Sequence, residues 1–396
     1  MEDRSNISFI KSIGGKLIAV SSLIIISAMV ILTVIALLQM SSSINGEAIA
    51  KLEAIQAGKQ TEILDLFERT GKDSEVISAT QEIKDAVEKL ILYHEEMNIS
   101  GTGDFDITGE SEDLTRSYTE IYDSINKDLQ KYNDVYGYYD VFIICAKHGH
   151  VMYTNAREAD LGENISVGQY RDSGLGKLYK KVQSEGKTAI VDLEPYAPSD
   201  DVPAMFIGSP LFEQGEMKAI IALQVNNGKI NKILNSTAGM GESGEAYCVG
   251  PDMLMRTESR FSKQGESTVL SLTVDTPASD VLNLEDSSTF HQVFKDYRGI
   301  EVVSVFSHTK IDETLNADFD WALIAEIDEA EIMAPVYSLI IILVILAAAI
   351  IAIAIVAMIF LSRSISKPIQ AAVEASQEIS KGNLKIHEKL ASFLLN

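Results

Sequence analysis

Three short motifs contain residue types that could bind a cofactor or a metal. Gly239, Gly241 and Gly244 form a literal G-x-G-x-x-G, but a dinucleotide fingerprint needs a strand before the glycines and a helix after them. The apolar periodicity predicts the opposite order here, so we interpret these glycines as a turn. His148 and His150 could bind a metal, but they fall at a predicted hairpin tip without nearby cysteines or clustered carboxylates. We interpret both as solvated turn residues, and we predict no metal and no cofactor.

Two cysteines and the lack of catalytic motifs limit the chemistry further. Cys145 and Cys248 lie at matching places in the first strands of two predicted hairpins. Because matching positions in different modules lie far apart, we predict two separate buried thiols rather than a disulfide. The sequence contains no recognisable Ser-His-Asp order, P-loop or paired-carboxylate motif. We therefore do not expect this chain to be an enzyme, although a catalytic output domain beyond it would make the whole protein one.

The region around residues 150–210 combines aromatic and charged side chains in the mixture that lines small-molecule pockets. Arg171 has the planar fork that binds a carboxylate bidentately. The alternative for each residue is a purely structural role, because a tyrosine on a strand usually packs in the core or at its rim. Amino acids, organic acids, amines and purines are all candidate ligands. The candidate ligand-binding residues are Tyr153, Tyr170, Arg171, Asp172, Asp192, Tyr196 and Phe206.

Two uncharged apolar segments predict transmembrane helices. Residues 17–38 and 336–361 comprise 22 and 26 residues without a charge, and a helix needs roughly 20 to cross the hydrocarbon core of a bilayer. A buried core helix would carry a polar face over such a length. The first segment is also longer than the apolar core of a signal peptide, roughly 7–15 residues, and no small-residue cleavage site follows it. We therefore predict two membrane-spanning helices after a short N-terminal segment, 1–16.

Acidic and basic residues are distributed unequally along the chain. The chain has 57 acids and 33 bases, for a net charge of −24, which argues against a nucleic-acid partner. Residues 39–335 hold 52 of the acids and 25 of the bases, whereas the two ends hold 5 acids and 8 bases. Short basic flanks stay in the cytoplasm. We therefore expect both termini to be cytoplasmic and region 39–335 to lie outside the cell membrane.

Apolar periodicity divides region 39–335 into a helical stalk and two modules of the α+β class. Spacings of three and four predict the stalk over 41–135, interrupted by a loop at 98–113. Period-two runs then predict two similar modules, 136–238 and 239–332, each with antiparallel strands around a helical insert. The predicted strands are 141–146, 151–155, 188–196, 204–212, 217–225, 246–250, 253–257, 301–309 and 321–328, and the helices lie within 168–186 and 226–238.

Several stretches resemble the double Cache sensor region of methyl-accepting chemotaxis proteins. Residues 362–384 resemble the first helix and connector of a HAMP domain, with Pro368 and Gly382 at the expected places. The resemblance implies a long helix and two tandem PAS-like modules between two transmembrane helices, in a chemoreceptor. The segments that carry it in the sensor region are 137–165, 192–212, 239–261 and 319–332. Spacings of three and four among Ile365, Ile369, Ala372, Ser376 and Ile379 predict the seam of a parallel coiled-coil homodimer, and an amphipathic helix on the bilayer surface is the alternative.

The resemblance also implies where a ligand binds. In double Cache sensors the ligand lies between the sheet and the helical insert of the membrane-distal module, and an Asp on the strand after the insert often holds an amine. Tyr170 lies in the predicted insert and Asp192 on the next strand. The Arg-x-Trp-Tyr pattern of amino-acid-binding members is absent, since Trp321 is the only tryptophan.

The C-terminal segment departs from the family pattern. A HAMP domain needs a second helix, which segment 362–396 lacks, so we interpret it as a partial HAMP domain. We expect the chain to be a fragment, a frameshifted product or a bare sensor. The alternatives to a chemoreceptor are the sensor portion of a membrane-bound histidine kinase or nucleotide cyclase, and a surface binding protein that does not signal.

Overall fold

The computed structural model describes residues 13–109, 117–225, 227–263, 265–284 and 288–361, with a few further positions between 364 and 381. It contains two compact units, one formed by Met1–Gly46 with Met333–Asn396 and the other by Glu47–Ile332. The predicted partial HAMP domain, including Pro368 and Gly382, lies almost entirely outside the described residues.

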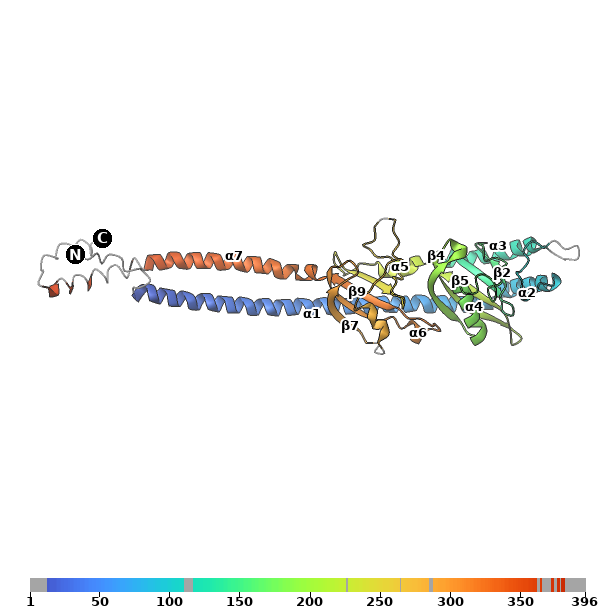
Figure 1. Ribbon diagram of the computed structural model, residues 1–396, viewed down its shortest axis with the longest axis horizontal. Helices are drawn as coiled ribbons and strands as arrows, with labels where there is room; N and C mark the ends of the chain where they lie inside the picture. The colour runs from blue at the N-terminus through green and yellow to red at the C-terminus, as the bar shows by residue number, and fades with distance from the viewer. Residues whose placement is uncertain are drawn as a thin grey trace. The chain divides into compact units, whose positions relative to one another are not determined.

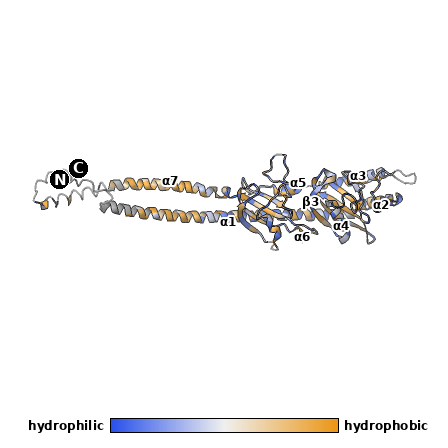
Figure 2. Ribbon diagram, viewed as in Figure 1, coloured by the Kyte–Doolittle hydropathy of each residue, from blue (hydrophilic) through white to orange (hydrophobic). Residues whose placement is uncertain are grey.

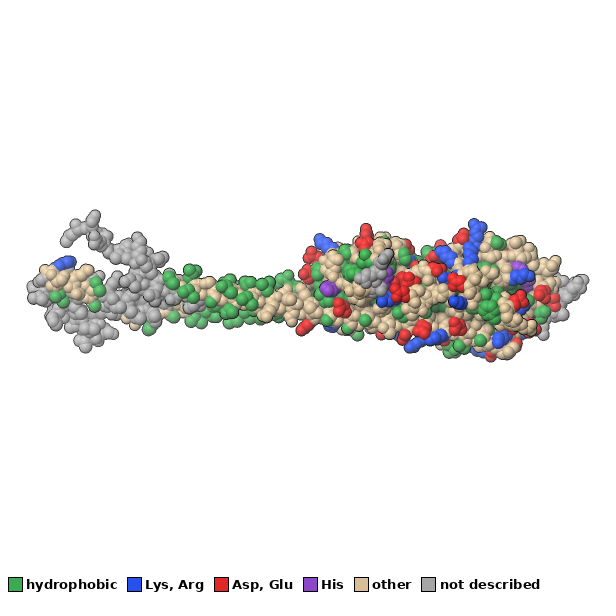
Figure 3. Space-filling model, turned by 90° about the horizontal axis from the view of Figure 1, so that it is seen from below, with side chains coloured by type: hydrophobic (Ala, Val, Ile, Leu, Met, Phe, Trp, Pro, Cys, Tyr) green, Lys and Arg blue, Asp and Glu red, His purple; other side chains and the backbone are tan. Residues whose placement is uncertain are grey.

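Each uncharged apolar segment lies within a long helix. Helix α1 (Ile13–Ala79) contains residues 17–38, and α7 (Glu329–Leu361) contains residues 336–361. Both helices are long and apolar enough to cross a membrane. Their large apolar side chains are exposed, for example Leu23 at 68% and Ile353 at 69%. Figure 2 shows both helices largely in the hydrophobic colour, and hydrophobic side chains cover much of the rod visible in Figure 3. Such exposure is unfavourable in water and ordinary in lipid.

The predicted stalk is built from the rest of α1 and two further helices. Helix α2 spans Gln81–Glu96 and α3 spans Tyr118–Tyr136. The structure adds a break that the sequence pattern did not predict, because Thr80 has an extended backbone and separates α1 from α2. At the start of α3, Ser117 and Glu120 form a capping box that satisfies free backbone N–H groups.

We call the first predicted module, 136–238, the distal module and the second, 239–332, the proximal module. The distal module is an antiparallel sheet covered on both faces. Its strand order is β2-β1-β5-β4-β3, and helix α4 (Gly174–Glu185) packs on one face while α2 and α3 pack on the other (Figure 1). Because both faces are buried, β1 is an unbroken apolar run after its first residue rather than an alternating one. The strands are β1 (Asp140–Cys145), β2 (Val151–Thr154), β3 (Ala189–Tyr196), β4 (Val202–Glu213) and β5 (Glu216–Val225).

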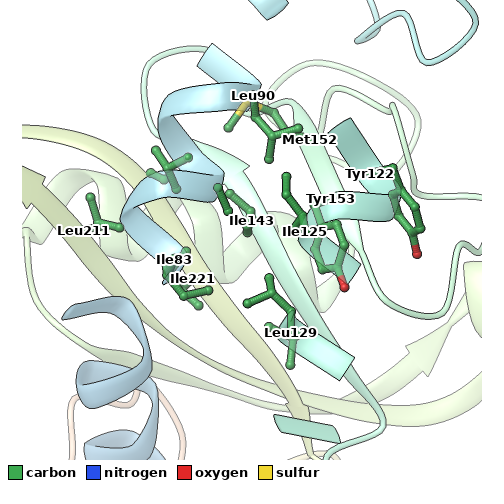
Figure 4. Close-up of a cluster of buried hydrophobic side chains, with 14 of the residues drawn as sticks. Ile83, Leu90, Tyr122, Ile125, Leu129, Ile143, Met152, Tyr153, Leu211 and Ile221 are labelled. Carbon is green, nitrogen blue, oxygen red and sulfur yellow. The ribbon is translucent and has the colours of Figure 1, made fainter. Parts of the chain in front are cut away.

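The face under α2 and α3 carries the larger apolar cluster. In Figure 4 the labelled side chains of the two helices point at those of the sheet. Tyr153 belongs to this face, where its ring stacks on that of Tyr122 at a centroid distance of 5.2 Å. The labelled residues are Ile83 and Leu90 of α2, Tyr122, Ile125 and Leu129 of α3, and Ile143, Met152, Tyr153, Leu211 and Ile221 of the sheet.

The proximal module repeats the pairing of the distal one. After the linking helix α5 (Asn227–Leu234), its strand order β6-β9-β8-β7 corresponds to β1-β5-β4-β3, since each module pairs its first strand with its last. The predicted α+β fold with antiparallel sheets is therefore confirmed. Its elements are β6 (Glu245–Val249), β7 (Phe290–Lys295), β8 (Glu301–His308), β9 (Ala322–Asp328) and the short helices η3 (Ser279–Asn283) and α6 (Ile311–Thr314).

In the proximal module, one predicted strand is wrong and one strand was missed. Residues 253–257 make only isolated bridges, Val249 with Met255 and Leu254 with Thr273, and Arg256 in this segment is buried in an ion pair with Asp192. Strand β7 was not predicted: it is an edge strand with mostly exposed side chains, so it lacks the alternation that marks a half-buried strand.

Candidate functional site

The face of the distal sheet beneath α4 carries a row of polar and aromatic residues. In the strand register, Asp140 of β1 pairs with Gln224 of β5, which pairs with Phe206 of β4. Paired residues of an antiparallel sheet point to the same face. Tyr196 at the end of β3 packs edge-on against Phe206, with ring centroids 4.8 Å apart, and Tyr170 packs against the same cluster. An acid, an amide and three aromatic rings therefore converge between the sheet and its helical insert.

A second acid enters this cluster from the loop after β2. The Asp160 side chain is fully buried, and Tyr196 donates a hydrogen bond from its hydroxyl to Asp160 Oδ2 at 2.6 Å. Within the described residues, Asp160 Oδ1 has no hydrogen-bond partner, and the same holds for Gln224 Oε1 and Asn155 Oδ1. Buried acceptors without donors are costly. The cluster therefore has acceptor capacity that the chain itself does not use.

The Asp140 carboxylate is better satisfied than that of Asp160. It accepts hydrogen bonds from the backbone N–H of Val141 and Asn155, each at 2.7 Å, and from the Thr154 hydroxyl. Burial raises the pKa of Asp140 to about 7, and the neighbouring Asp160 adds to this. Burial likewise raises the pKa of Asp160 to about 6. Two desolvated acids in one cluster make it a site of unfavourable negative charge.

This arrangement suits a cationic group. A bound ammonium would donate to the unpaired Asp160 Oδ1 and offset the charge of both carboxylates. The rings of Tyr196, Phe206 and Tyr170 would supply the apolar wall, and aromatic faces attract cations. We call Asp140, Asp160, Tyr170, Tyr196, Phe206 and Gln224 the distal acidic cluster.

Three of the seven residues singled out in the sequence lie in this cluster, namely Tyr170, Tyr196 and Phe206. Arg171 and Asp172 do not: their side chains are 59% and 75% exposed and pair with each other at 3.2 Å. Tyr153 lies on the opposite face of the sheet, fully buried, with its hydroxyl donating to Asn126 Oδ1 at 2.8 Å.

Asp192 is turned away from the cluster by the backbone of β3. The pairing of β3 with β4 shifts register between Val191 and Glu194, and such a bulge re-aims the side chains within it. Asp192 instead accepts hydrogen bonds from Arg256 Nη2 at 2.9 Å and from Trp321 Nε1 at 2.8 Å. Both donors belong to the proximal module, so Asp192 joins the two modules.

The sequence patterns did not identify Asp140, Asp160 or Gln224. Asp140 directly precedes the apolar run of β1, and Gln224 is the one amide in the apolar end of β5. A polar residue inside a strand that is buried on both faces is the signal that could have found them. Asp160 lies in a loop and gave no such signal.

The glycine-rich motif forms the predicted turn and has a specific partner. The backbone N–H groups of Glu242 and Ser243 donate to the two carboxylate oxygens of Glu331, at 2.9 and 2.8 Å. Gly241 has φ +71°, and a Cβ there would lie 2.2 Å from Glu331 Oε1. Glycine is therefore required for the approach of Glu331, which lies in the first turn of α7. Burial alone would raise the pKa of Glu331, but these hydrogen bonds outweigh it and lower the pKa.

The predictions for the cysteines and histidines had different outcomes. Cys145 and Cys248 are free and buried, which confirms the prediction of two separate thiols. The interpretation of His150 as a solvated turn residue is wrong, because its side chain is fully buried. His148 is partly buried against Cys145, with Sγ 3.8 Å from its Nδ1.

Solved structures that resemble the chain are sensor and ligand-binding domains. The sensor domain of the histidine kinase DctB from V. cholerae is 12% identical, with a TM-score of 0.45, over 73% of this chain and 98% of that one. The sensory domain of the chemoreceptor Tlp3 from Campylobacter jejuni is 8% identical, with a TM-score of 0.46, over 74% and 98%. The same Tlp3 domain with isoleucine bound is 8% identical, with a TM-score of 0.44, over 74% of this chain and 97% of that one. No protein-family model and no curated protein sequence matches the chain.

The contact of Asp192 with the proximal module predicts a loss of stability when it is removed. Arg256 is 3% exposed, so Asp192→Ala leaves a buried guanidinium with Asp252 as its remaining acid. We expect the free energy of unfolding to fall by about 3 kcal/mol, measured by urea unfolding of the full chain in detergent followed by circular dichroism. Asp172→Ala, at an exposed pair, should change it by less than about 0.5 kcal/mol. Equal effects of the two variants would contradict the joining role of Asp192.

The distal acidic cluster predicts a pH dependence of stability. An unfolded Asp has a pKa of about 3.9, whereas the folded-state pKa values are about 7 for Asp140 and about 6 for Asp160. The folded state therefore binds more protons between these values, and the free energy of unfolding should fall as pH rises from about 4 to about 7. Asp160→Asn should remove about 2–3 kcal/mol of this fall. A variant with the same pH profile as the parent would show that Asp160 is not desolvated.

Proposed function

We propose that this chain is a membrane-anchored sensor of the double Cache type, which binds a small molecule with a cationic amine in its distal module. The observation that carries the proposal is the unpaired, fully buried oxygen of Asp160 beneath the helical insert. A ligand ammonium is the group that would best satisfy this oxygen, because an ammonium supplies both hydrogen-bond donors and positive charge. Free amines and amino acids both present this group.

Five of the six residues of the distal acidic cluster have a stated role in this proposal. Asp160 accepts from the ammonium, and Tyr196 holds the Asp160 carboxylate in place through its hydroxyl. Asp140 sets the negative potential from a position that its backbone donors keep rigid. Tyr170 and Phe206 form the apolar wall and exclude water. An organic acid without an amine would meet two carboxylates and be repelled.

The path from the modules to the second apolar helix is covalent and short. Strand β9 ends at Asp328 and α7 begins at Glu329, and the turn that holds Glu331 also contacts Asp328, whose backbone N–H donates to the Ser243 hydroxyl at 3.1 Å. In this proposal the bound amine favours one of two arrangements of the modules, and the turn passes that preference to α7. The ligand can shift the equilibrium only by its difference in affinity between the two states.

The output in this proposal is chemotaxis, with the segment after α7 acting as the start of a HAMP domain in a homodimer. The sensor region 39–335 would face the outside of the cell membrane and both termini the cytoplasm, as the basic flanks favour. A histidine kinase or nucleotide cyclase with the same sensor is the second candidate. The coding sequence downstream of residue 396 distinguishes them, since a methylated coiled coil and a catalytic domain have different sequences.

Ligand binding is tested with the full chain in detergent against amino acids, linear diamines, organic acids and purines. At about a hundred times its Kd, an amine should raise the free energy of unfolding by roughly 2.7 kcal/mol, measured as a shift in Tm. Asp160→Asn should abolish the shift, whereas Asp172→Asn, an exposed acid of the insert region, should keep it. The proposal fails if only compounds without an amine shift Tm, or if Asp160→Asn leaves the shift intact.

The turn that holds Glu331 is tested by two glycine variants. Gly241→Ala places a Cβ against Glu331, whereas Gly215→Ala has a similar positive φ of +84° but nothing within 4 Å. Both carry the same backbone strain, so their difference isolates the contact. Loss of two charge-assisted hydrogen bonds should speed amide exchange in the first turns of α7 by about 10–100-fold in Gly241→Ala. Equal exchange in the two variants would show that the turn does not hold α7.

A further inference from the structure

Three histidines from two distant segments meet at the end of the distal module opposite the cluster described above. His94 lies near the C-terminal end of α2, and His148 and His150 lie at the turn between β1 and β2. One ring nitrogen of each lies within 4.8 Å of those of the other two. His94 Nε2 and His150 Nδ1 are 3.1 Å apart. Such convergence of three imidazoles is the ligand arrangement of many transition-metal sites.

The ring of His150 is held in the orientation that metal binding needs. Its Nε2 lies 2.9 Å from the carbonyl oxygen of Gly103, and because a carbonyl only accepts, Nε2 carries the proton. The lone pair is then on Nδ1, which points at His94. The Gly103 carbonyl is itself held by the Asn164 side-chain amide at 3.2 Å. A ligating histidine that donates its other N–H to a backbone carbonyl is the usual outer-shell arrangement of metal sites.

The rings of the other two histidines, His94 and His148, are also held next to each other. The rings of His94 and His148 stack with a 10° interplanar angle at a centroid distance of 5.1 Å. Because His150 Nδ1 accepts, His94 Nε2 donates the hydrogen bond between these two rings, and a metal ion would take the place of that proton.

A pocket adjoins the three histidines and gives an ion access from solvent. It has a volume of about 380 Å³ and is lined by His94 and His148 with Cys145, Met152 and Glu95 among its other walls. Space for an ion with a water molecule is therefore present. Sulfur and imidazole surroundings favour zinc and copper over magnesium or calcium, which prefer oxygen ligands.

We propose that His94, His148 and His150 bind one divalent transition-metal ion, with Zn²⁺ as the best match, and that its fourth position faces the pocket. Two nitrogens at about 2.0–2.1 Å from a tetrahedral Zn²⁺ lie about 3.4 Å apart, close to the separation of His94 and His150. The ion ties α2 to the β1–β2 turn. This site does not depend on the amine-binding cluster, and either can exist without the other.

The test uses the full chain in detergent, purified by an affinity tag that contains no histidine, because a histidine tag would itself bind the metal. Titration with Co²⁺ should give the visible absorption of a tetrahedral site at one equivalent per chain, and Zn²⁺ should displace it. His94→Gln and His148→Ala should each weaken Zn²⁺ binding at least about tenfold in calorimetry, because loss of even an outer-shell partner costs about 10–100-fold. We choose these two residues because both are only partly buried, whereas His150 is buried and its replacement could unfold the module.

His291→Ala is the matched control, since this exposed histidine on β7 lies outside the group of three. It should bind Co²⁺ and Zn²⁺ like the parent, and circular dichroism verifies that all variants fold. The proposal is overturned if the parent chain gives no tetrahedral Co²⁺ spectrum. It is also overturned if folded His94→Gln and His148→Ala chains bind Zn²⁺ as tightly as His291→Ala does.

Discussion

The carboxylate of Asp192 makes the buried ion pair that joins the two modules. It lies on a bulge in β3 and accepts hydrogen bonds from Arg256 and Trp321 of the proximal module. Arg256 can reach it only because residue 250 is glycine, where a Cβ would lie 2.1 Å from the guanidinium. A buried charge pair of this kind stabilises little by itself but costs much to break. The contact therefore ties an edge strand of the distal sheet to the proximal module.

The two sites that we propose in the distal module have opposite character. The acidic cluster under α4 has buried acceptors without donors, a deficit that a cationic ligand would correct. The three histidines, one on α2 and two in the β1–β2 turn, converge, and His94 and His150 share a hydrogen bond at the place of the metal ion that we propose. In the acidic cluster, the chain positions polar groups at a cost that its own contacts do not offset. At the histidines, the support is the convergence of three ring nitrogens.

The glycine-rich turn binds an anion through its backbone N–H groups, and that anion is a side chain of the same protein. Phosphate-binding loops bind anions in the same way, but here the anion is the Glu331 carboxylate. The contact lies where the last strand becomes α7. Because the turn precedes β6 and Glu331 follows β9, it also closes the proximal module by joining its beginning to its end.

The sequence by itself determined the α+β class, the two apolar helices and most strands, because these depend on local periodicity and charge. The edge strand β7 was not predicted, because it buries few side chains and shows no alternation. The segment around Arg256 was predicted wrongly, because Arg256 pairs with Asp192, which lies 64 residues earlier in the chain. Only the tertiary structure decided which polar residues act together. The register of β1, β5 and β4 aligns Asp140, Gln224 and Phe206, and the bulge removes Asp192 from that face. Likewise, the packing of α2 on the sheet brings His94 to His150, 56 residues apart in the chain, because side-chain convergence depends on register and packing that no local pattern encodes.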